Sequence, residues 1–402
     1  MTLGLYLSVP FCRTKCSYCN FASDVFSKGA YESYVARLLE DITAARRLAS
    51  ELGCTLPETV DSIYLGGGTP SILSGDQLQR IFTALREQFT VDPAAEITVE
   101  CAPGTLSPSL IETLLACGVN RVSLGVQSFV DKEAQSVGRL HTRAIVLEEI
   151  ARLRAAGLHN INVDLIAGLP HQTAESWTLS LNEAIATGVP HTSVYMLEVD
   201  EDSRLGRELI AGGTRYHAHF VPDDEATSDF YLQACQTLNA AGIAQYEISN
   251  FARTGFESRH NLKYWTRQPY LGFGVDAHSM LATDRATGTR AVRFSVPDSL
   301  DAYMNRGPRP VTPVSERAAL EECFFLGLRL NQGIDLGKLR AQFGENRLAD
   351  GEKAIEECVR EGLLEPQGTR ICLTSRGRLL SNEVFERFLT EESTVGPASA
   401  VV

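Results

Sequence analysis

The sequence has 402 residues, of which 44% are hydrophobic and 22% are charged, values typical of a globular protein with a large core. Its net charge of −13 excludes broad nucleic-acid binding, because Lys and Arg supply most of that affinity by neutralising phosphates. No apolar run approaches the ~18 residues of a membrane span and the first residues do not resemble a secretory signal, so we expect a cytoplasmic protein.

Six short apolar runs alternate with helical patterns in the first half of the chain. This alternation predicts βα units and a parallel sheet. Because there are six units rather than eight, we predict an α/β fold with an incomplete (β/α)6 TIM-like barrel, whose side opening must be covered by later segments or by a large ligand. The runs are 3–9, 62–65, 96–101, 121–126, 162–167 and 192–197.

Composition divides the chain into four parts. We expect the barrel over 1–235, with a polar excursion at 199–222, and a covering segment over 236–310 that ends in linker-like sequence. Helical patterns at 316–330, 336–343 and 352–361, a hairpin at 362–374 and a last helix at 375–389 predict a winged-helix-like domain over 311–390. The region 315–390 carries 11 Lys and Arg against 13 Asp and Glu, which favours covering or docking over DNA binding. The tail at 391–402 is expected to be disordered.

Three of the ten cysteines follow the first strand directly: Cys12, Cys16 and Cys19. That position lies at the C-terminal face of the barrel, where barrel enzymes carry their sites. Thiolates suit zinc or iron-sulfur clusters, but a structural zinc site takes four ligands and no fourth Cys or His is close in the sequence. A [4Fe-4S] cluster on three cysteines keeps one iron open to an external group. We therefore favour this cluster over zinc and over cysteines that bind no metal.

The segment CRTKCSYC resembles the CxxxCxxC motif of the radical S-adenosylmethionine (SAM) enzymes. The resemblance implies that the open iron binds the amino and carboxylate groups of the methionine part of SAM. It also assigns Gly67, Gly68 and Thr69, in the GGGTP segment after the second strand, to the methionine amino group. Taken alone, such a segment is an ordinary tight loop.

Further polar side chains lie within successive strands or at their ends and are expected to meet at one face. Each of them alone is equally compatible with a satisfied buried polar group. Together they match SAM-contacting positions in the coproporphyrinogen oxidase branch of the radical SAM proteins, and one tyrosine matches the aromatic position beside the adenine. The matched residues are Tyr6, Glu100, Gln127, Arg139 and Asp164, with Tyr18 at the adenine position.

Within this branch the sequence resembles the HemW-type haem chaperones more than the oxygen-independent coproporphyrinogen III oxidases. The oxidases carry a further cysteine two residues after the third ligand, where this chain has Phe21 after Asn20, and an N-terminal extension before the first strand. The segment HNLKYW matches the HNxxYW motif associated with haem in the chaperones, which makes His260, Asn261, Tyr264 and Trp265 the haem-associated residues. Coproporphyrinogen oxidation is retained as the alternative and is expected to be absent.

Haem chemistry agrees with this motif, because imidazole binds iron and aromatic rings cover a macrocycle. The alternative is structural: His260 hydrogen-bonds a loop and Trp265 plugs the barrel. The resemblance further implies haem-accepting respiratory proteins as partners, a homodimer and contact with a membrane surface. His217 and His219 are interpreted as solvent-exposed and His171 as a surface residue, all without a role.

Overall fold

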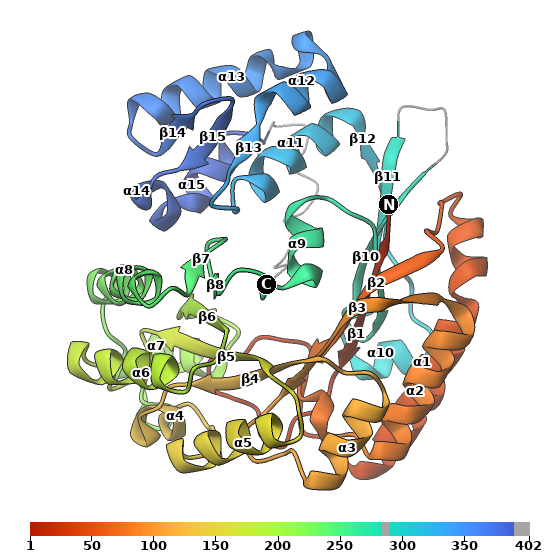
Figure 1. Ribbon diagram of the computed structural model, residues 1–402, viewed down its shortest axis with the longest axis vertical. Coiled ribbons are helices and arrows are strands. Elements are labelled where there is room, and N and C mark those ends of the chain that lie inside the picture. The colour runs from red at the N-terminus through yellow and green to blue at the C-terminus, as the bar shows by residue number, and fades with distance from the viewer. Residues whose placement is uncertain (284–288, 390–402) are drawn as a thin grey trace.

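The computed structural model describes residues 1–283 and 289–389 (Figure 1). One 12-stranded sheet with helices on its outer side extends from the N-terminus to Ser315, and a smaller domain with a three-stranded sheet follows it. The predicted disordered tail, 391–402, lies outside the described residues.

Six βα units form the first part of the large sheet, so the predicted fold class is confirmed. Each predicted strand is present, and the main difference is that the second and third begin earlier than expected. The strands are β1 (Leu3–Val9), β2 (Thr59–Gly67), β3 (Thr90–Cys101), β4 (Arg121–Gln127), β5 (Asn160–Ala167) and β6 (His191–Met196). The helices are α1 (Lys28–Glu51), α2 (Gly75–Gln88), α3 (Pro108–Ala116), α4 (Asp131–Ser136), α5 (Arg143–Ala155) and α6 (Ala174–Ala186), with a 3-10 turn η1 (Pro70–Ile72) after β2.

Local sequence signals define the helix boundaries. Ser74 and Thr173 form capping boxes at the starts of α2 and α6, which satisfies amide groups that have no partner inside a helix. Gly118 and Gly157 follow the ends of α3 and α5, where glycine is favoured.

The strands of the large sheet follow the order β12-β11-β10-β9-β1-β2-β3-β4-β5-β6-β8-β7. Strands β1 to β6 are parallel, and β9 pairs in parallel with β1, with Gly4 opposite Tyr270. The first strand in the sequence therefore lies inside the sheet, between β2 and a strand that is contributed by the covering segment.

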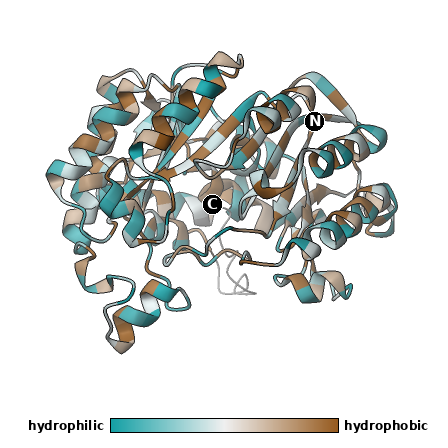
Figure 2. Ribbon diagram, turned by 90° about the horizontal axis from the view of Figure 1, so that it is seen from below, coloured by the Kyte–Doolittle hydropathy of each residue, from teal (hydrophilic) through white to brown (hydrophobic). Residues whose placement is uncertain are grey.

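Side chains alternate along each barrel strand, because successive residues of a strand point to opposite faces. On β1, Leu5 and Leu7 belong to the apolar core, whereas Tyr6 contacts Tyr64 of β2 inside the barrel. The outer helices show teal and brown alternating around each turn (Figure 2), as expected for helices with one face on the sheet and the other in solvent. Inside the barrel, polar side chains such as Ser123 of β4 and Asn162 of β5 hydrogen-bond to each other, so the interior is the polar side of these strands.

The excursion after β6 and the covering segment contain short elements. The end of the covering segment, expected to be linker-like, instead includes strand β11 of the large sheet, so that expectation was wrong. The alternation of apolar residues in β11 outweighs its turn-rich flanks. The elements are α7 (Arg204–Ala211), η2 (Ala218–Phe220), α8 (Asp224–Ala240), β7 (Ala244–Gln245), β8 (Asn250–Ala252), α9 (Arg259–Trp265), β9 (Tyr270–Gly274), β10 (His278–Ala282), β11 (Thr289–Ser295), α10 (Leu300–Met304) and β12 (Val311–Ser315).

The C-terminal domain has the helix and hairpin order of a winged-helix module, as predicted. Strand β12 belongs to the large sheet, so the sheet extends past the expected boundary at 310. The helix expected at 352–361 begins earlier, and the last predicted helix is broken in two. The elements are α11 (Glu316–Gly327), β13 (Ile334–Asp335), α12 (Leu336–Phe343), α13 (Glu345–Arg360), β14 (Leu364–Gln367), β15 (Arg370–Leu373), α14 (Ser375–Leu379) and α15 (Ser381–Glu386).

This domain bridges the two sides of the open barrel, with α9 between it and the strands (Figure 1). Near β7 and β8, the Ile248 amide donates to the Arg329 carbonyl at 3.1 Å. On the other side, Glu322 of α11 accepts from Arg293 Nε of β11 at 2.8 Å and from Arg267 Nε, after α9, at 2.6 Å. The side opening that six units leave is therefore covered by the chain itself.

Candidate cluster and cofactor site

The loop after β1 holds the three cysteines and is fixed by other loops at the same end of the barrel. Lys15 Nζ donates to the Phe21 carbonyl at 2.6 Å, which closes the loop on itself. The Ser17 amide donates to the Val137 carbonyl at 3.1 Å, and the Ser17 carbonyl accepts from the Leu205 amide at 2.8 Å. Segments that follow β4 and β6 thus set the shape of the cysteine loop.

Hydrogen-bond partners surround the sulfurs of two cysteines. Arg139 Nη1 donates to Cys16 Sγ at 3.6 Å, and Thr69 Oγ1 lies 3.8 Å from Cys12 Sγ. A guanidinium beside a sulfur favours the thiolate, the form that binds metal. Burial raises the pKa of Cys19, and Lys15 opposes that shift.

The donor set fits an iron-sulfur cluster better than a single ion. Among the described residues, no three His, Cys, Asp or Glu side chains converge on one ion position, whereas a [4Fe-4S] cluster binds each thiolate to a different iron and needs the sulfurs apart. Ser17 Oγ and Arg139 Nε are buried without a partner within the described chain. Such unsatisfied groups are costly, and they are expected beside a ligand that completes the site.

The glycine segment after β2 packs against the beginning of the cysteine loop. The Gly68 amide donates to the Val9 carbonyl and the Thr69 amide to the Phe11 carbonyl, both at 2.8 Å. Gly67 has φ +96, and a Cβ built on Gly66 would lie 2.9 Å from Glu100 Oε1. The glycines therefore allow two close approaches, one to the cysteine loop and one to a carboxylate.

Two carboxyl groups lie in the polar interior. Tyr64 OH donates to Glu100 Oε1 at 2.8 Å, and Asp164 accepts from Ser123 Oγ at 3.1 Å and from Asn162 Nδ2 at 2.7 Å. Burial raises the pKa of Asp164, and it raises the pKa of Glu100 to about 8, with Asp164 adding to that shift. A cationic ligand that enters this region would favour the ionised form of both groups.

The raised pKa of Glu100 makes stability depend on pH. Because the folded-state value is above the ordinary value of 4.5, the contribution of Glu100 to stability is lost as pH rises from about 4.5 to about 8. We expect Glu100→Gln to remove this loss. Going from about pH 5 to about pH 9, the variant should therefore gain a few kcal/mol in free energy of unfolding relative to the wild type, since one pKa unit corresponds to about 1.4 kcal/mol. Urea unfolding of the cluster-free protein at both pH values measures this.

The exposed Glu148 on α5 provides the control, because Glu148→Gln should follow the wild type at both pH values. If Glu100→Gln and wild type lose stability in parallel between the two pH values, Glu100 titrates normally and the expectation is wrong.

Gln127 and Arg139 meet at the end of β4. Gln127 has φ 67, a left-handed conformation that is uncommon for a side chain of this size, at an irregularity in the pairing of β4 with β5. A Cβ built on Gly125 would lie 3.0 Å from Gln127 Nε2 and 3.1 Å from Arg139 Nη2, and Arg139 also donates to the Gly125 carbonyl. Because Arg139 also reaches Cys16, this strand end is joined to the cysteine loop.

The two predicted tyrosines lie in different surroundings. Tyr18 packs with Val137, Ile166 and Leu169, and burial followed by the nearby Cys16 raises its pKa well above the ordinary value. Tyr6 stacks on Tyr64 at 6.1 Å, deeper in the barrel. Tyr18 is thus placed beside the cysteines, whereas Tyr6 lines the interior below them.

The HNxxYW segment forms α9 at the other end of the barrel from the cysteines. His260 is buried, and its Nδ1 lies 3.0 Å from Ser62 Oγ while its Nε2 lies 2.9 Å from Tyr264 OH. Its amide donates to Glu96, near the start of the parallel part of β3. Burial, followed by Lys263, lowers the pKa of His260 to about 3. Both ring nitrogens are therefore engaged inside the protein.

The rest of the segment joins the barrel to the C-terminal domain. Trp265 is buried and lies under the Arg329 guanidinium, 4.4 Å from it. Tyr264 packs edge-on against Tyr270 at 4.6 Å. Asn261 is half-buried at the start of α9. These predicted haem residues lie away from the cysteines. His260 does meet one predicted SAM residue, because its ring stacks on Tyr6 with the ring centroids 6.2 Å apart.

Several interior residues were not predicted from the sequence. Tyr64 contacts both Glu100 and His260, and His191 lies between Asn162 and the Tyr246 hydroxyl. The available signal was the two-residue period, which places Ser62, Tyr64 and Gly66 on one face of β2. The same period predicts the inward faces of the other strands.

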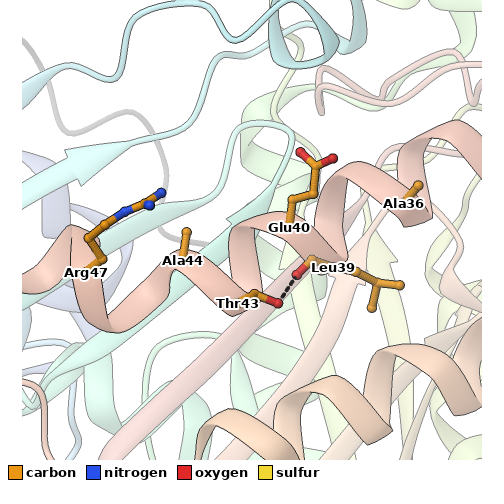
Figure 3. A pocket seen from close by; sticks show the side chains of 6 residues that line it. All are labelled: Ala36, Leu39, Glu40, Thr43, Ala44 and Arg47. Carbon is orange, nitrogen blue, oxygen red and sulfur yellow. Dashed lines mark hydrogen bonds between the residues drawn. The ribbon is translucent and has the colours of Figure 1, made fainter.

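A shallow surface depression on α1 is unrelated to this site (Figure 3). It is lined by residues of one helix only, and none of the predicted site residues takes part. The lining residues are Ala36, Leu39, Glu40, Thr43, Ala44 and Arg47.

Comparisons with known proteins agree with the fold. The radical SAM superfamily model matches residues 6–184, and the HemN C-terminal domain model matches residues 314–380. The solved coproporphyrinogen III oxidase of Escherichia coli has a TM-score of 0.80 at 23% identity, over 96% of this chain and 90% of that chain. This similarity shows a shared fold. No helix among the described residues has the length and apolar character needed to cross a membrane.

Curated relatives are similar along nearly the whole chain. Haem chaperone HemW of Bacillus subtilis is 33% identical, over 96% of this chain and 99% of its own length. The corresponding values are 32%, 96% and 97% for HemW of Lactococcus lactis, and 31%, 97% and 98% for HemW of Escherichia coli. The chain therefore belongs to the HemW family within the radical SAM superfamily.

Proposed function

We propose that Cys12, Cys16 and Cys19 hold a [4Fe-4S] cluster whose open iron binds SAM. Support comes from the three thiols in one loop, the Arg139 contact to Cys16, and the unsatisfied Arg139 Nε and Ser17 Oγ. When bound, the cluster supplies a redox centre with one exchangeable position. We assign the SAM contacts to residues of the cysteine loop, the glycine segment, the barrel strands and the loop after α4: Tyr6, Tyr18, Gly67, Gly68, Thr69, Glu100, Gln127, Arg139 and Asp164.

In the same proposal, the protein binds haem and delivers it to haem-accepting respiratory proteins. The observation that carries it is full-length similarity to proteins named haem chaperones. The cysteine loop supports the chaperone over the oxidase. The oxidases that the sequence resembles carry a further cysteine at the position of Phe21, which is exposed here, and the neighbouring Asn20 donates to Asp200 at 2.9 Å. HNxxYW stays a predicted haem-associated segment, but His260 in this structure has no nitrogen available for iron.

An anaerobic haem titration of cluster-reconstituted protein, followed at the Soret band, tests the haem proposal. We expect a saturable change in the wild type and no SAM-dependent decarboxylation of coproporphyrinogen III. Absence of specific haem binding contradicts the chaperone proposal, and decarboxylation together with 5′-deoxyadenosine release establishes the oxidase alternative.

We also propose a cytoplasmic location, a homodimer and contact with a membrane surface. A reducing compartment suits a cluster held by thiolates. Sedimentation of cluster-loaded and cluster-free protein, with and without vesicles containing anionic lipid, tests the last two proposals.

A further inference from the structure

Three histidines gather at the surface where the loop after β5 meets the excursion after β6. His171 follows β5, and His217 and His219 flank the start of η2. The His171 and His217 rings lie 5.2 Å apart, and the Phe220 ring lies 4.0 Å from both His171 and His219. The His171 amide donates to the Phe220 carbonyl at 3.0 Å. We name His171, His217 and His219 the histidine cluster.

The imidazoles of this cluster are accessible and have no hydrogen-bond or ion-pair partner among the residues that the structure describes. His171 and His217 are half-buried and His219 is exposed. By contrast, both ring nitrogens of His191 and of His260 are occupied inside the barrel. Iron coordination requires a free ring nitrogen, so the buried histidines are poor candidates and the cluster is a good one.

Two of these histidines have a strained backbone conformation. His171 has φ 68 and His217 has φ 62, left-handed conformations that persist in non-glycine residues when the surroundings hold them there. Burial, followed by Lys132 and the other two histidines, lowers the pKa of His171, which favours the neutral ring, the form that donates a lone pair to a metal.

A shallow, open basic groove adjoins the cluster through Tyr216. Its lining includes Arg204, Arg207 and Arg215, all exposed, and the Arg215 guanidinium lies 5.3 Å from the Tyr216 ring. We name these three residues the arginine groove. Glu208 of α7 fixes the groove to the cluster, because its carboxylate accepts from the Tyr216 amide at 2.8 Å.

Apolar surface lies on the same excursion. Leu209, Ile210 and Phe220 are 54%, 67% and 46% exposed. Haem combines three needs: an imidazole for iron, a flat apolar surface for the macrocycle, and cations for two propionates. No three metal-binding side chains within the described residues converge on a single ion, which favours an iron held in a macrocycle over a bare metal ion.

We propose that an imidazole of the histidine cluster is the axial ligand of haem, a proposal that rests on the haem binding proposed above. The macrocycle covers Phe220 and the propionates reach the arginine groove. The site adjoins the proposed cluster, since the Leu205 amide donates to the Ser17 carbonyl at 2.8 Å and Arg204 Nη1 donates to the Lys15 carbonyl at 3.3 Å. Cluster loading and haem binding thus share one stretch of backbone.

The test compares four full-length, cluster-reconstituted proteins in anaerobic haem titrations at the Soret band. They are the wild type; the triple variant His171→Asn, His217→Asn, His219→Asn; the control His159→Asn, His278→Asn; and His260→Gln. Asparagine tolerates a positive φ, so the triple variant keeps the backbone. His159 and His278 are exposed elsewhere on the surface and serve as matched controls.

We expect the triple variant to bind haem at least about tenfold more weakly, since even outer partners of a metal ligand contribute that much, and to lose the Soret position of histidine-ligated haem. The control and His260→Gln should keep the wild-type band. If the triple variant titrates with haem as the wild type does, the ligand assignment is wrong and the haem proposal stands. The same holds if only His260→Gln loses haem binding. Absence of saturable binding in the wild type overturns the haem proposal and the ligand assignment with it.

Discussion

Replacement of Cys16 by serine is expected to abolish the iron-sulfur cluster. Iron in the anaerobically reconstituted protein should fall from about four per chain to below about one, because two thiolates do not hold a [4Fe-4S] cluster against loss. Cys16 is buried and accepts a hydrogen bond from Arg139, so no other thiol can replace it from solvent. Iron analysis and the visible absorption of the cluster measure the effect.

Cys101 provides the matched control for this experiment. It is buried next to Glu100, and its thiol donates to the Val99 carbonyl at 3.7 Å, a contact that serine can make. Cys101→Ser should keep its full iron content. About four irons per chain in Cys16→Ser, with the fold intact by circular dichroism, would disprove the ligand assignment.

Removal of Glu322 is expected to loosen the C-terminal domain from the barrel. Glu322 is 8% exposed, and its carboxylate forms ion pairs with Arg267 at 2.6 Å and with Arg293 at 2.8 Å. Glu322→Ala removes the carboxylate from the largely buried guanidinium groups of Arg267 and Arg293. Removing one partner of a buried ion pair typically lowers the free energy of unfolding by about 3–5 kcal/mol. We expect a lower urea midpoint and faster proteolysis between the sheet and α11.

A surface pair provides the comparison. Arg47 and Glu51 lie 3.7 Å apart, with 76% and 64% of their side chains exposed, and exposed pairs contribute little. Glu51→Ala should therefore unfold as the wild type does. Equal midpoints for Glu322→Ala and wild type would show that the other contacts, such as the Ile248 amide to the Arg329 carbonyl, hold the domain in place without Glu322.

The barrel was predictable because its signals are local. Apolar runs, capping residues such as Ser74 and Thr173, and the alternation of strands with helices each act within a few residues. The same pattern gave the position of the cysteine loop, of Glu100 and Gln127 at the ends of β3 and β4, and of Asp164 within β5, since parallel strands end at one face.

Contacts between distant segments could not be read in this way. The sequence places His260 in a motif, but it does not show that Ser62 and Tyr264 occupy both ring nitrogens. Nor does it show that β11 and β12 continue the sheet, because their flanks have turn composition. The gathering of His171 with His217 likewise depends on two loops that meet only in the folded chain.

The place of β1 between β2 and β9 has a consequence for biosynthesis. The ribosome makes Leu3–Val9 first, but Tyr270–Gly274, its second neighbour, leaves the ribosome roughly half a minute later at about 10 residues per second. During that interval one edge of an apolar strand is open to pairing with other chains. The segments that fix the cysteine loop, at Val137 and Leu205, emerge before the edge is closed. The segments that complete the cysteine loop are therefore present while β1 has only one of its two neighbours, and an open strand edge of this kind exposes the half-made barrel to aggregation.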